Sequence, residues 1–307
     1  MINQVYKNGK PKVIVIVGPT ASGKSALAVE VARRFNGEIV SADSRQVYRG
    51  MDIGTAKPSR KDMDVVRHHL IDIKNPNQNY TAGQYKKDAI KAIDKIIKSG
   101  KIPILVGGTG LYIDAVVKNL EFPKVKENKK LRARLEREIK ERGLDLVFKK
   151  LVDLDPEAAY IVDPKNPRRV IRALEVALVS GRPFSAQRKI GKPLYETLEI
   201  GLNPAQSILR ERITERIKQM VKDGLVDEVR GLVKKYGLSC KAFDAIDYRE
   251  IVDYLKGKVD LAEAVGQMDK NTWHYAKRQM TWFKRNKNIK WVKNSREALS
   301  LVRKASL

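Results

Sequence analysis

The sequence predicts an α/β protein in which a doubly wound parallel sheet is interrupted by a helical insertion. Short runs of β-branched residues, of which residues 13–17 are the first, are typical of strands buried on both faces of a parallel sheet. They alternate with stretches whose apolar residues recur at helical spacing. Residues 122–193 hold 19 basic and 10 acidic residues, which indicates a separate unit with a basic face.

The elements of the core follow in chain order. Residues 13–17 predict the first strand, and the stretch after Lys24 predicts the first helix. Further strands are predicted at residues 38–42, 69–73, 102–108, 195–202 and 288–292, and further helices at residues 82–100 and 207–224. Ligands of such sheets bind at the carboxyl ends of the strands, so Gly18, Asp43 and Gly107 should converge there.

Two domains are predicted. Residues 1–121 and 195–307 form the α/β core with its C-terminal helices, and residues 122–194 form the insertion. The insertion begins as a lysine-rich linker and continues as one charged amphipathic helix. A chain of 307 residues, 42% of them hydrophobic, can bury a core of ordinary size.

Composition excludes several classes of protein. No apolar run approaches the roughly 20 residues of a membrane span, and the first residues lack the apolar stretch of a signal peptide, so a cytoplasmic protein without a membrane partner is expected. The single cysteine, Cys240, excludes an intramolecular disulfide and a cysteine-rich zinc site. A monomer is expected because no dimerisation stripe is evident.

The formal charge of +26 indicates a polyanionic partner. Lysine and arginine number 62 against 36 acidic residues. Such an excess repels itself and is usually compensated by nucleic acid. A lysine-rich proteome or a warm habitat is the alternative, but either would raise glutamate as well.

A phosphate-binding motif joins the first strand to the first helix. The pattern G-x-x-x-x-G-K-[ST] is met by Gly18, Pro19, Thr20, Ala21, Ser22, Gly23, Lys24 and Ser25. In a P-loop of this type the backbone N–H groups and the helix N-terminus hold phosphate oxygens, Lys24 adds charge, and the Ser25 hydroxyl can ligate Mg²⁺. The motif predicts a phosphate or diphosphate site without naming the ligand.

Two further strand ends carry polar side chains. Asp43 follows the second strand, where a carboxylate can accept a proton or bind a metal through water. The alternative is an ordinary turn or helix-cap aspartate. Thr109, after two glycines, offers a hydroxyl at the same edge, although a tight turn explains those glycines equally well.

Arginines of one predicted helix are candidates for contact with a diphosphate. Arg210, Arg212 and Arg216 are spaced so that the last two share a face. One of them could offset the charge that develops on a leaving group. Surface pairing with Glu211 and Glu215 is the alternative that spacing favours.

Two basic segments are candidates for binding nucleic acid. Arg168, Arg169 and Arg172 lie at a predicted helix start inside the insertion, and residues 276–285 mix basic with aromatic residues. Arginine forks hold phosphates and aromatic rings stack on unpaired bases. A solvated charged face is an equally fair interpretation of both.

The motifs occur in the order seen in bacterial tRNA dimethylallyltransferases, the tRNA isopentenyltransferase family, which the sequence resembles over roughly residues 12–291. The matching segments are GPTASGKS, DSRQVYRGMDIGTAKPS, HHLIDI, PILVGGTGLY, NPRRVIRALEV, MVKDGLVDEV and AKRQMTWFKR. The second of these is far more specific than the phosphate-binding motif.

The resemblance implies an enzyme that transfers the dimethylallyl group of dimethylallyl diphosphate to N6 of adenine 37 of tRNA. The P-loop would then hold the donor's diphosphate with Mg²⁺ at Ser25. By similarity Arg216 stabilises the leaving group, Asp43 takes the proton of the amine, and Thr20 and Thr109 help to line the channel for the adenine. The implied tRNA contacts are Asp43, Ser44, Arg45, Gln46, Thr109, Arg132, Arg168, Arg169 and Arg172.

Two segments depart from the family pattern. Asp247 stands where a glycine is expected, and Trp273 and His274 replace a more basic sequence. The alternatives to a tRNA enzyme are an adenylate isopentenyltransferase that acts on free AMP, a small-molecule or nucleoside kinase, and an RNA-binding protein with a relic loop.

Overall fold

The computed structural model describes residues 9–187 and 189–306. Residues 1–8, Arg188 and Leu307, which the predicted domain ranges include, lie outside the described residues. The chain divides into two compact units, one of Met1–Val117 with Pro193–Leu307 and one of Lys118–Lys192.

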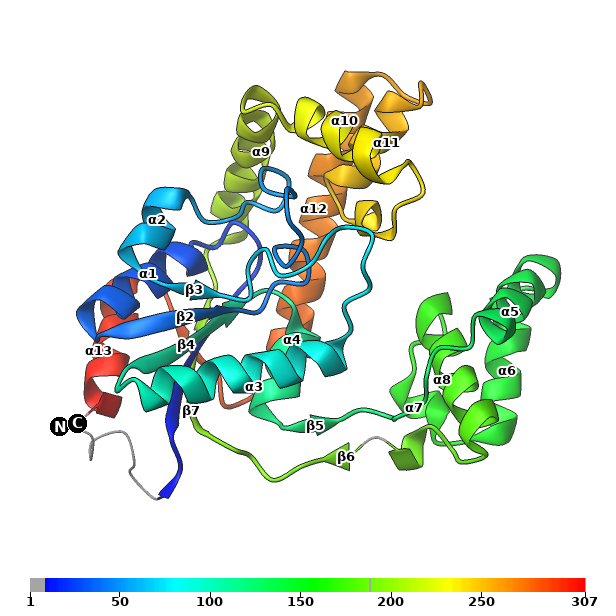
Figure 1. Ribbon diagram of the computed structural model, residues 1–307, viewed down its shortest axis with the longest axis horizontal. Helices are drawn as coiled ribbons and strands as arrows, with labels where there is room; N and C mark the ends of the chain where they lie inside the picture. The colour runs from blue at the N-terminus through cyan, green and yellow to red at the C-terminus, as the bar shows by residue number, and fades with distance from the viewer. Residues whose placement is uncertain (1–8, 188, 307) are drawn as a thin grey trace. The chain divides into compact units, whose positions relative to one another are not determined.

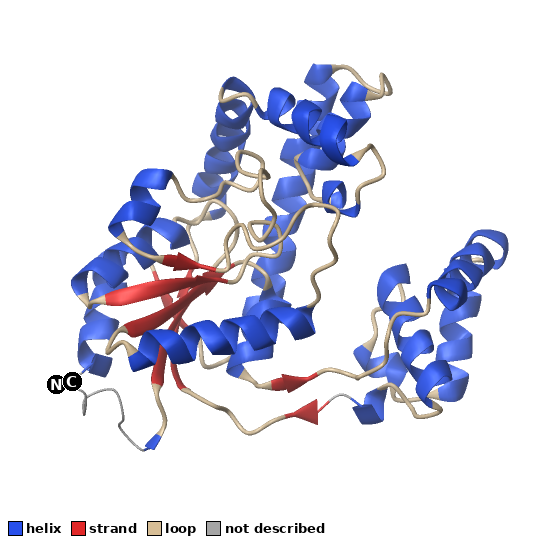
Figure 2. Ribbon diagram, viewed as in Figure 1, coloured by secondary structure: helices blue, strands red, loops and turns tan. Residues whose placement is uncertain are grey.

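The first unit is built on a six-stranded sheet whose strands are all parallel (Figure 2). Its spatial order is β3-β2-β4-β1-β7-β8. The strands are β1 (Lys12–Val17), β2 (Gly37–Ser41), β3 (His68–His69), β4 (Ile102–Gly107), β7 (Glu196–Leu202) and β8 (Lys290–Val292). The predicted doubly wound parallel sheet is therefore confirmed.

Helices cover both faces of this sheet because its strands are apolar on both. Ile14 and Ile16 of β1 face a core closed by α1 (Lys24–Arg34) and α13 (Ser295–Ser306). Val13, Val15 and Val17 face a second core beneath α3 (Ala82–Lys98) and α4 (Gly110–Val117). The alternation follows from the two-residue period of a strand, and Figure 1 shows α1 and α3 on opposite faces.

One predicted strand is mostly absent. Of residues 69–73, only His69 lies in the short strand β3. Leu70 and Asp72 have positive φ angles of 65° and 56°, which no β-strand allows. The apolar run therefore turns away from the sheet after two residues of pairing.

A helical group of the first unit lies between β7 and β8 in the chain (Figure 1). It consists of α9 (Gln206–Lys222), α10 (Leu225–Tyr236), α11 (Tyr248–Leu255) and α12 (Leu261–Phe283), with the 3₁₀ helix Lys241–Asp244. The short helix α2 (Arg60–Val65) lies apart from this group, between β2 and β3. The helix predicted over residues 207–224 ends at Lys222. Gly224, with φ of 96°, begins α10 instead.

The second unit is a helical bundle with its own core. It contains β5 (Leu120–Glu121), paired antiparallel with β6 (Lys189–Ile190), and the helices α5 (Lys129–Arg142), α6 (Leu144–Leu154), α7 (Ala158–Ile161) and α8 (Pro167–Ser180), with the 3₁₀ helix Ser185–Gln187. Leu135, Val147 and Leu174 are buried at its centre. The single amphipathic helix predicted after the linker is wrong, because Gly143 with φ of 87° separates α5 from α6.

In the described part of the chain, no helix combines the length and apolarity that a bilayer crossing requires.

Candidate active site

The P-loop motif forms a tight turn between β1 and α1. Gly23 caps the helix with φ of 89°, and Ala21 also has a positive φ of 61°. Residues 20–25 line a cavity of about 460 Å³, together with Asp43, Gln46 and Arg216. The predicted phosphate loop, the carboxylate and the arginine thus face one cavity.

Lys24 is one of the cations that line this cavity, together with Lys57 and Arg216. Its Nζ donates to the Pro19 carbonyl at 3.1 Å. Desolvation lowers the pKa of Lys24 to about 8; the Asp43 carboxylate opposes this shift and the Arg216 charge adds to it. An anion bound in the cavity would stabilise the charged form of Lys24 and raise its pKa, so the binding of phosphate and the protonation of this lysine favour each other.

Asp43 follows β2 and opens a turn. Its Oδ1 accepts hydrogen bonds from the N–H groups of Arg45 at 2.8 Å and Gln46 at 3.3 Å. Within the described residues, Oδ2 accepts no hydrogen bond. The two interpretations of Asp43 are compatible, since the turn fixes one carboxylate oxygen while the residue also lines the cavity.

The loops that follow β1, β2 and β4 meet because these strands are neighbours in the sheet. At Gly107 a Cβ atom would lie 2.2 Å from the Ala42 carbonyl oxygen, so only glycine permits this approach. Thr109 then accepts a hydrogen bond from the Ser44 N–H at 3.1 Å. The predicted convergence at the carboxyl edge is confirmed.

Of the three arginines on α9, only Arg216 reaches the cavity. Its Nη1 donates to the Thr20 hydroxyl at 3.3 Å, and desolvation lowers its pKa. Arg210 instead forms an ion pair with Asp269, and Arg212 is exposed. The surface pairing suggested by spacing therefore does not apply to Arg216.

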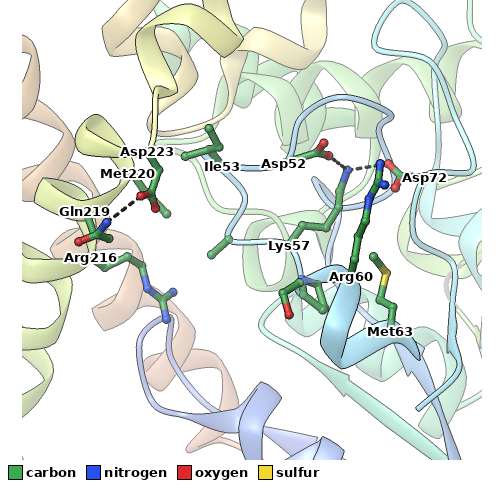
Figure 3. Close-up of a pocket in the computed structure, with 13 residues that line it drawn as sticks. Asp52, Ile53, Lys57, Arg60, Met63, Asp72, Arg216, Gln219, Met220 and Asp223 are labelled. Atoms are coloured by element: carbon green, nitrogen blue, oxygen red, sulfur yellow. Dashed lines mark hydrogen bonds and ion pairs between the residues drawn. The ribbon is translucent and has the colours of Figure 1, made fainter. Parts of the chain in front are cut away.

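A second cavity of about 550 Å³ adjoins the first, since residues 56–59 and Arg216 line both. Figure 3 shows Arg216 and Gln219 on one side of it and Lys57 and Arg60 on the other. The side chain of Lys57 is only 4% exposed, and its Nζ lies 2.6 Å from Asp72 Oδ1 and also pairs with Asp52. This buried lysine ties the loop of residues 52–57 to the turn that replaces the predicted strand.

The predicted tRNA contacts after Asp43 also hold this loop together. The Gln46 amide donates to the carbonyls of Thr55 and Ala56 at 3.3 Å and accepts from the Ser41 hydroxyl. Arg45 Nη1 donates to the Ala242 carbonyl at 3.5 Å. Gln46 and Arg45 therefore hold parts of the protein together, whether or not they also contact RNA.

The four arginines of the insertion that were predicted to contact tRNA lie in the second unit. Two of them pair with a buried carboxylate and two are exposed. Arg132 and Arg172 both donate to the fully buried carboxylate of Glu175. Their interaction lowers the pKa of Glu175 against the effect of burial. Arg168 and Arg169 are exposed in the first turn of α8. The side chains of Arg132 and Arg172 remain 30% and 34% exposed, respectively.

The segment of residues 276–285 separates its aromatic and basic residues. Phe283 is buried in the core, and Trp282 packs against Gly110, where a Cβ would lie 2.3 Å from its ring. Lys277 and Arg278 are exposed. These two aromatic rings are therefore structural, and the charged face is the part available to a partner.

Some residues at the site carry no signal that we recognised in the sequence. Glu228 accepts from the N–H groups of Asp52 at 3.0 Å and Ile53 at 2.8 Å and from the Tyr248 hydroxyl at 2.5 Å. Gln279 of α12 reaches the phosphate loop from a distant part of the chain. Isolated polar residues on amphipathic helices resemble ordinary surface positions until the fold is known.

Asp247 is a buried carboxyl group at a strained position. It is 7% exposed, has φ of 76°, and accepts a hydrogen bond from Thr272 at 3.3 Å. Burial, followed by the nearby Glu250, raises the pKa of Asp247 to about 8, although Thr272 and Arg216 act in the opposite direction. This aspartate, the departure from the family pattern, is therefore protonated at neutral pH.

We expect Asp247→Asn to remove a pH dependence of stability. The unfolded chain releases the Asp247 proton near pH 4 and the folded protein near pH 8, so between these values the folded state binds more protons. The free energy of unfolding then decreases as pH rises, by about 1.4 kcal/mol per pH unit. Asparagine keeps the shape, tolerates positive φ and does not titrate.

Denaturant unfolding at several pH values measures this effect as the difference between wild type and variant. The variant should gain relative stability from pH 4 to pH 8. A difference that does not change with pH would show that the Asp247 carboxyl is not protonated in the folded protein.

Comparison with known proteins places the chain in a family. The family model described as IPP transferase matches residues 46–286. A tRNA dimethylallyltransferase of Thermoanaerobacter sp. is 46% identical over 286 residues, 91% of each chain, and one of Carboxydothermus hydrogenoformans is 44% identical over 294 residues, 95% of this chain and 94% of the other.

Solved structures agree as well. The tRNA isopentenylpyrophosphate transferase of Bacillus halodurans is 39% identical with a TM-score of 0.72, covering 96% of both chains. A eukaryotic dimethylallyltransferase acting on tRNA is 28% identical with a TM-score of 0.77, covering 92% of this chain and 73% of the other. The match of the family model over most of the chain and these relatives lead to one conclusion: the chain belongs to the IPP transferase family.

Proposed function

We propose that the protein transfers the dimethylallyl group of dimethylallyl diphosphate to N6 of adenine 37 in tRNA. The observation that carries this proposal is the cavity in which the P-loop, the Asp43 carboxylate and the Arg216 guanidinium face one another. Prenyl transfer to tRNA also follows from the names of the relatives, which are tRNA dimethylallyltransferases.

The P-loop side of the cavity would hold the diphosphate. The backbone N–H groups at the start of α1, the Lys24 ammonium and the Arg216 guanidinium supply donors and positive charge. The Ser22 hydroxyl in this loop is buried without a hydrogen-bond partner in the described structure. These groups stabilise the charge that develops when the bond between C1 and the diphosphate oxygen breaks.

Mg²⁺ fits this side of the cavity. It needs few protein ligands when phosphate oxygens and water complete its shell, and the exposed Ser25 hydroxyl and the Asp43 carboxylate line the space. Residues 9–187 and 189–306 contain no group of three or more His, Cys, Asp or Glu side chains suited to a metal. Among these described residues, side chains alone therefore do not form a complete coordination shell. Bound Mg²⁺ would add neutralising charge to the leaving group.

Asp43 would act on the acceptor. The adenine amine is a weak nucleophile because its lone pair is delocalised into the ring, so its proton must leave as the new N6–C1 bond forms. In this proposal the Oδ2 atom of Asp43 takes that proton, while Oδ1 keeps its two hydrogen bonds in the turn. The products are the dimethylallyl adenine, diphosphate and the protonated carboxyl group.

The charge of +26 supports tRNA as the acceptor, since adenylate alone gives no reason for it. Exposed Arg168 and Arg169 of the basic insertion are the proposed phosphate contacts. A monomeric enzyme remains our expectation.

Incubation with labelled dimethylallyl diphosphate, Mg²⁺ and an anticodon stem-loop tests the proposal. We expect N6-dimethylallyladenosine from a stem-loop with adenine at position 37 and none when this adenine is replaced. Prenylation of free AMP but not of the stem-loop would identify an adenylate isopentenyltransferase. Transfer of the ATP γ-phosphate without binding of dimethylallyl diphosphate would identify a kinase.

A further inference from the structure

Gln279 of α12 joins two loops of the candidate active site. Its Oε1 accepts from the Thr20 N–H at 2.8 Å, and its Nε2 donates to the Gly108 carbonyl at 2.9 Å. The side chain is buried, with 6% of the residue exposed. A backbone N–H can only donate and a carbonyl can only accept, so these partners fix the orientation of the amide.

The loop after β4 is shaped to receive this amide. At Gly108 a Cβ would lie 2.1 Å from Gln279 Nε2, and at Gly110 a Cβ would lie 2.3 Å from the Trp282 ring. Gln279 and Trp282 are three residues apart and so share a face of α12. This face of α12 is therefore docked on the loop at two glycines, where a Cβ atom would displace the Gln279 amide or the Trp282 ring.

The strands themselves do not hold the two loops together. The pairing of β1 with β4 ends at Val17 and Gly107, before either Thr20 or Gly108 is reached. Beyond that point the Gln279 amide links the two loops directly. A cross-link at this place sets the separation of the loops more tightly than the sheet alone.

Each of the two loops that the Gln279 amide joins is connected to a group with a proposed role in the reaction. On one side, the Thr20 hydroxyl accepts from Arg216 at 3.3 Å, and the P-loop continues to Lys24. On the other, Thr109 follows Gly108 and accepts from the Ser44 N–H at 3.1 Å, beside the Asp43 turn.

We propose that Gln279 is a positioning residue that clamps the P-loop to the loop after β4 and so aligns the donor with the Asp43 carboxylate. The inference rests on the proposed function, because it assigns the donor to one loop and the proton acceptor to the other. A bound geometry that is wrong by about 1 Å costs on the order of 10²-fold in rate.

The test compares Gln279→Met and Gln279→Glu with wild type and with Gln267→Met. Methionine keeps the volume and loses both hydrogen bonds, whereas glutamate still accepts from Thr20 but places an oxygen against the Gly108 carbonyl. Gln267 lies on the same helix and bonds only to Glu263 among the described residues, so its replacement by methionine is the matched control. Should Gln279→Met lose its cooperative melting transition, Gln279→Glu answers the same question.

Three quantities are measured: the single-turnover rate of prenyl transfer, the affinity for the stem-loop, and the ratio of dimethylallyl alcohol to prenylated RNA. We expect both Gln279 variants to transfer about 10²-fold more slowly, with stem-loop affinity and melting temperature close to those of Gln267→Met. The alcohol ratio should rise, because water intercepts a donor that is misaligned with the amine.

An unchanged rate in both Gln279 variants would overturn the proposal. So would a slower rate with an unchanged alcohol ratio, since that pattern indicates a smaller active fraction and not misalignment. If the wild-type protein transfers no prenyl group, the proposed function is refuted. If the wild type is active and the Gln279 variants are equally active, only the role of Gln279 is refuted.

Discussion

Asp43→Asn is expected to transfer the prenyl group about 10² to 10⁴ times more slowly than the wild type, the range that a positioned general base contributes. Asparagine keeps Oδ1, so the hydrogen bonds from the N–H groups of Arg45 and Gln46 persist and the turn is preserved. The amide nitrogen that replaces Oδ2 cannot take the proton of the adenine amine. The substitution thus removes the proton acceptor and preserves the conformation of the loop.

Single-turnover transfer to an anticodon stem-loop measures the effect, with stem-loop affinity and melting temperature measured in parallel. Asp64→Asn is the matched control, because Asp64 is exposed on α2. The control should match the wild type. If Asp43→Asn transfers at the wild-type rate, Asp43 is not the base and its carboxylate serves only the turn.

The parts of the fold that could be predicted depend on local patterns. The continuous β-branched run of β1, the phosphate-binding motif and the apolar spacing of α1 point to one answer, and the structure has them as predicted. Because parallel strands end at the same edge, the convergence of the loops after β1, β2 and β4 could also be expected. These predictions needed no knowledge of distant contacts.

The errors arose where tertiary contacts outweigh the local pattern. Residues 69–73 read as a strand, but Asp72 turns out to pair with the buried ammonium of Lys57, and positive φ angles at Leu70 and Asp72 end the pairing. The aromatic residues near the C-terminus suggested base stacking, yet Phe283 is buried in the core and the half-buried Trp282 packs against Gly110. Periodicity alone does not distinguish these outcomes.

The candidate site could be predicted only in part for the same reason. Lys24 and Asp43 come after strands of a parallel sheet, so the topology predicts that both lie at the carboxyl edge of the sheet, where they line the cavity. Spacing could not separate Arg216 from Arg212, which shares its helix face, and the fold shows that Arg216 lines the cavity while Arg212 is exposed. Gln279 had no signal of its own, since its two partners lie more than 150 residues away in sequence.

Arg216→Met is expected to slow prenyl transfer by about 10² to 10³-fold, the loss seen when one donor to a developing negative charge is removed. Arg216 is half-buried and lines both cavities beside Thr20, so its charge acts where solvent screening is reduced. Arg212→Met is the matched control, since Arg212 is exposed one turn earlier on the same helix. Single-turnover rates at saturating donor separate this effect from weaker donor binding.

A second readout follows from the electrostatics of the cavity. Arg216 is one of the causes that lower the pKa of Lys24 to about 8, so its removal should raise that pKa. The pH at which inorganic diphosphate binding declines should accordingly shift upward in Arg216→Met, because Lys24 holds its proton to higher pH. Added guanidinium should restore part of the rate by filling the vacated space. A variant with the wild-type rate and the wild-type pH dependence would place the leaving group away from Arg216, and the charge that stabilises its departure would then have to come from Lys24 and the P-loop amides.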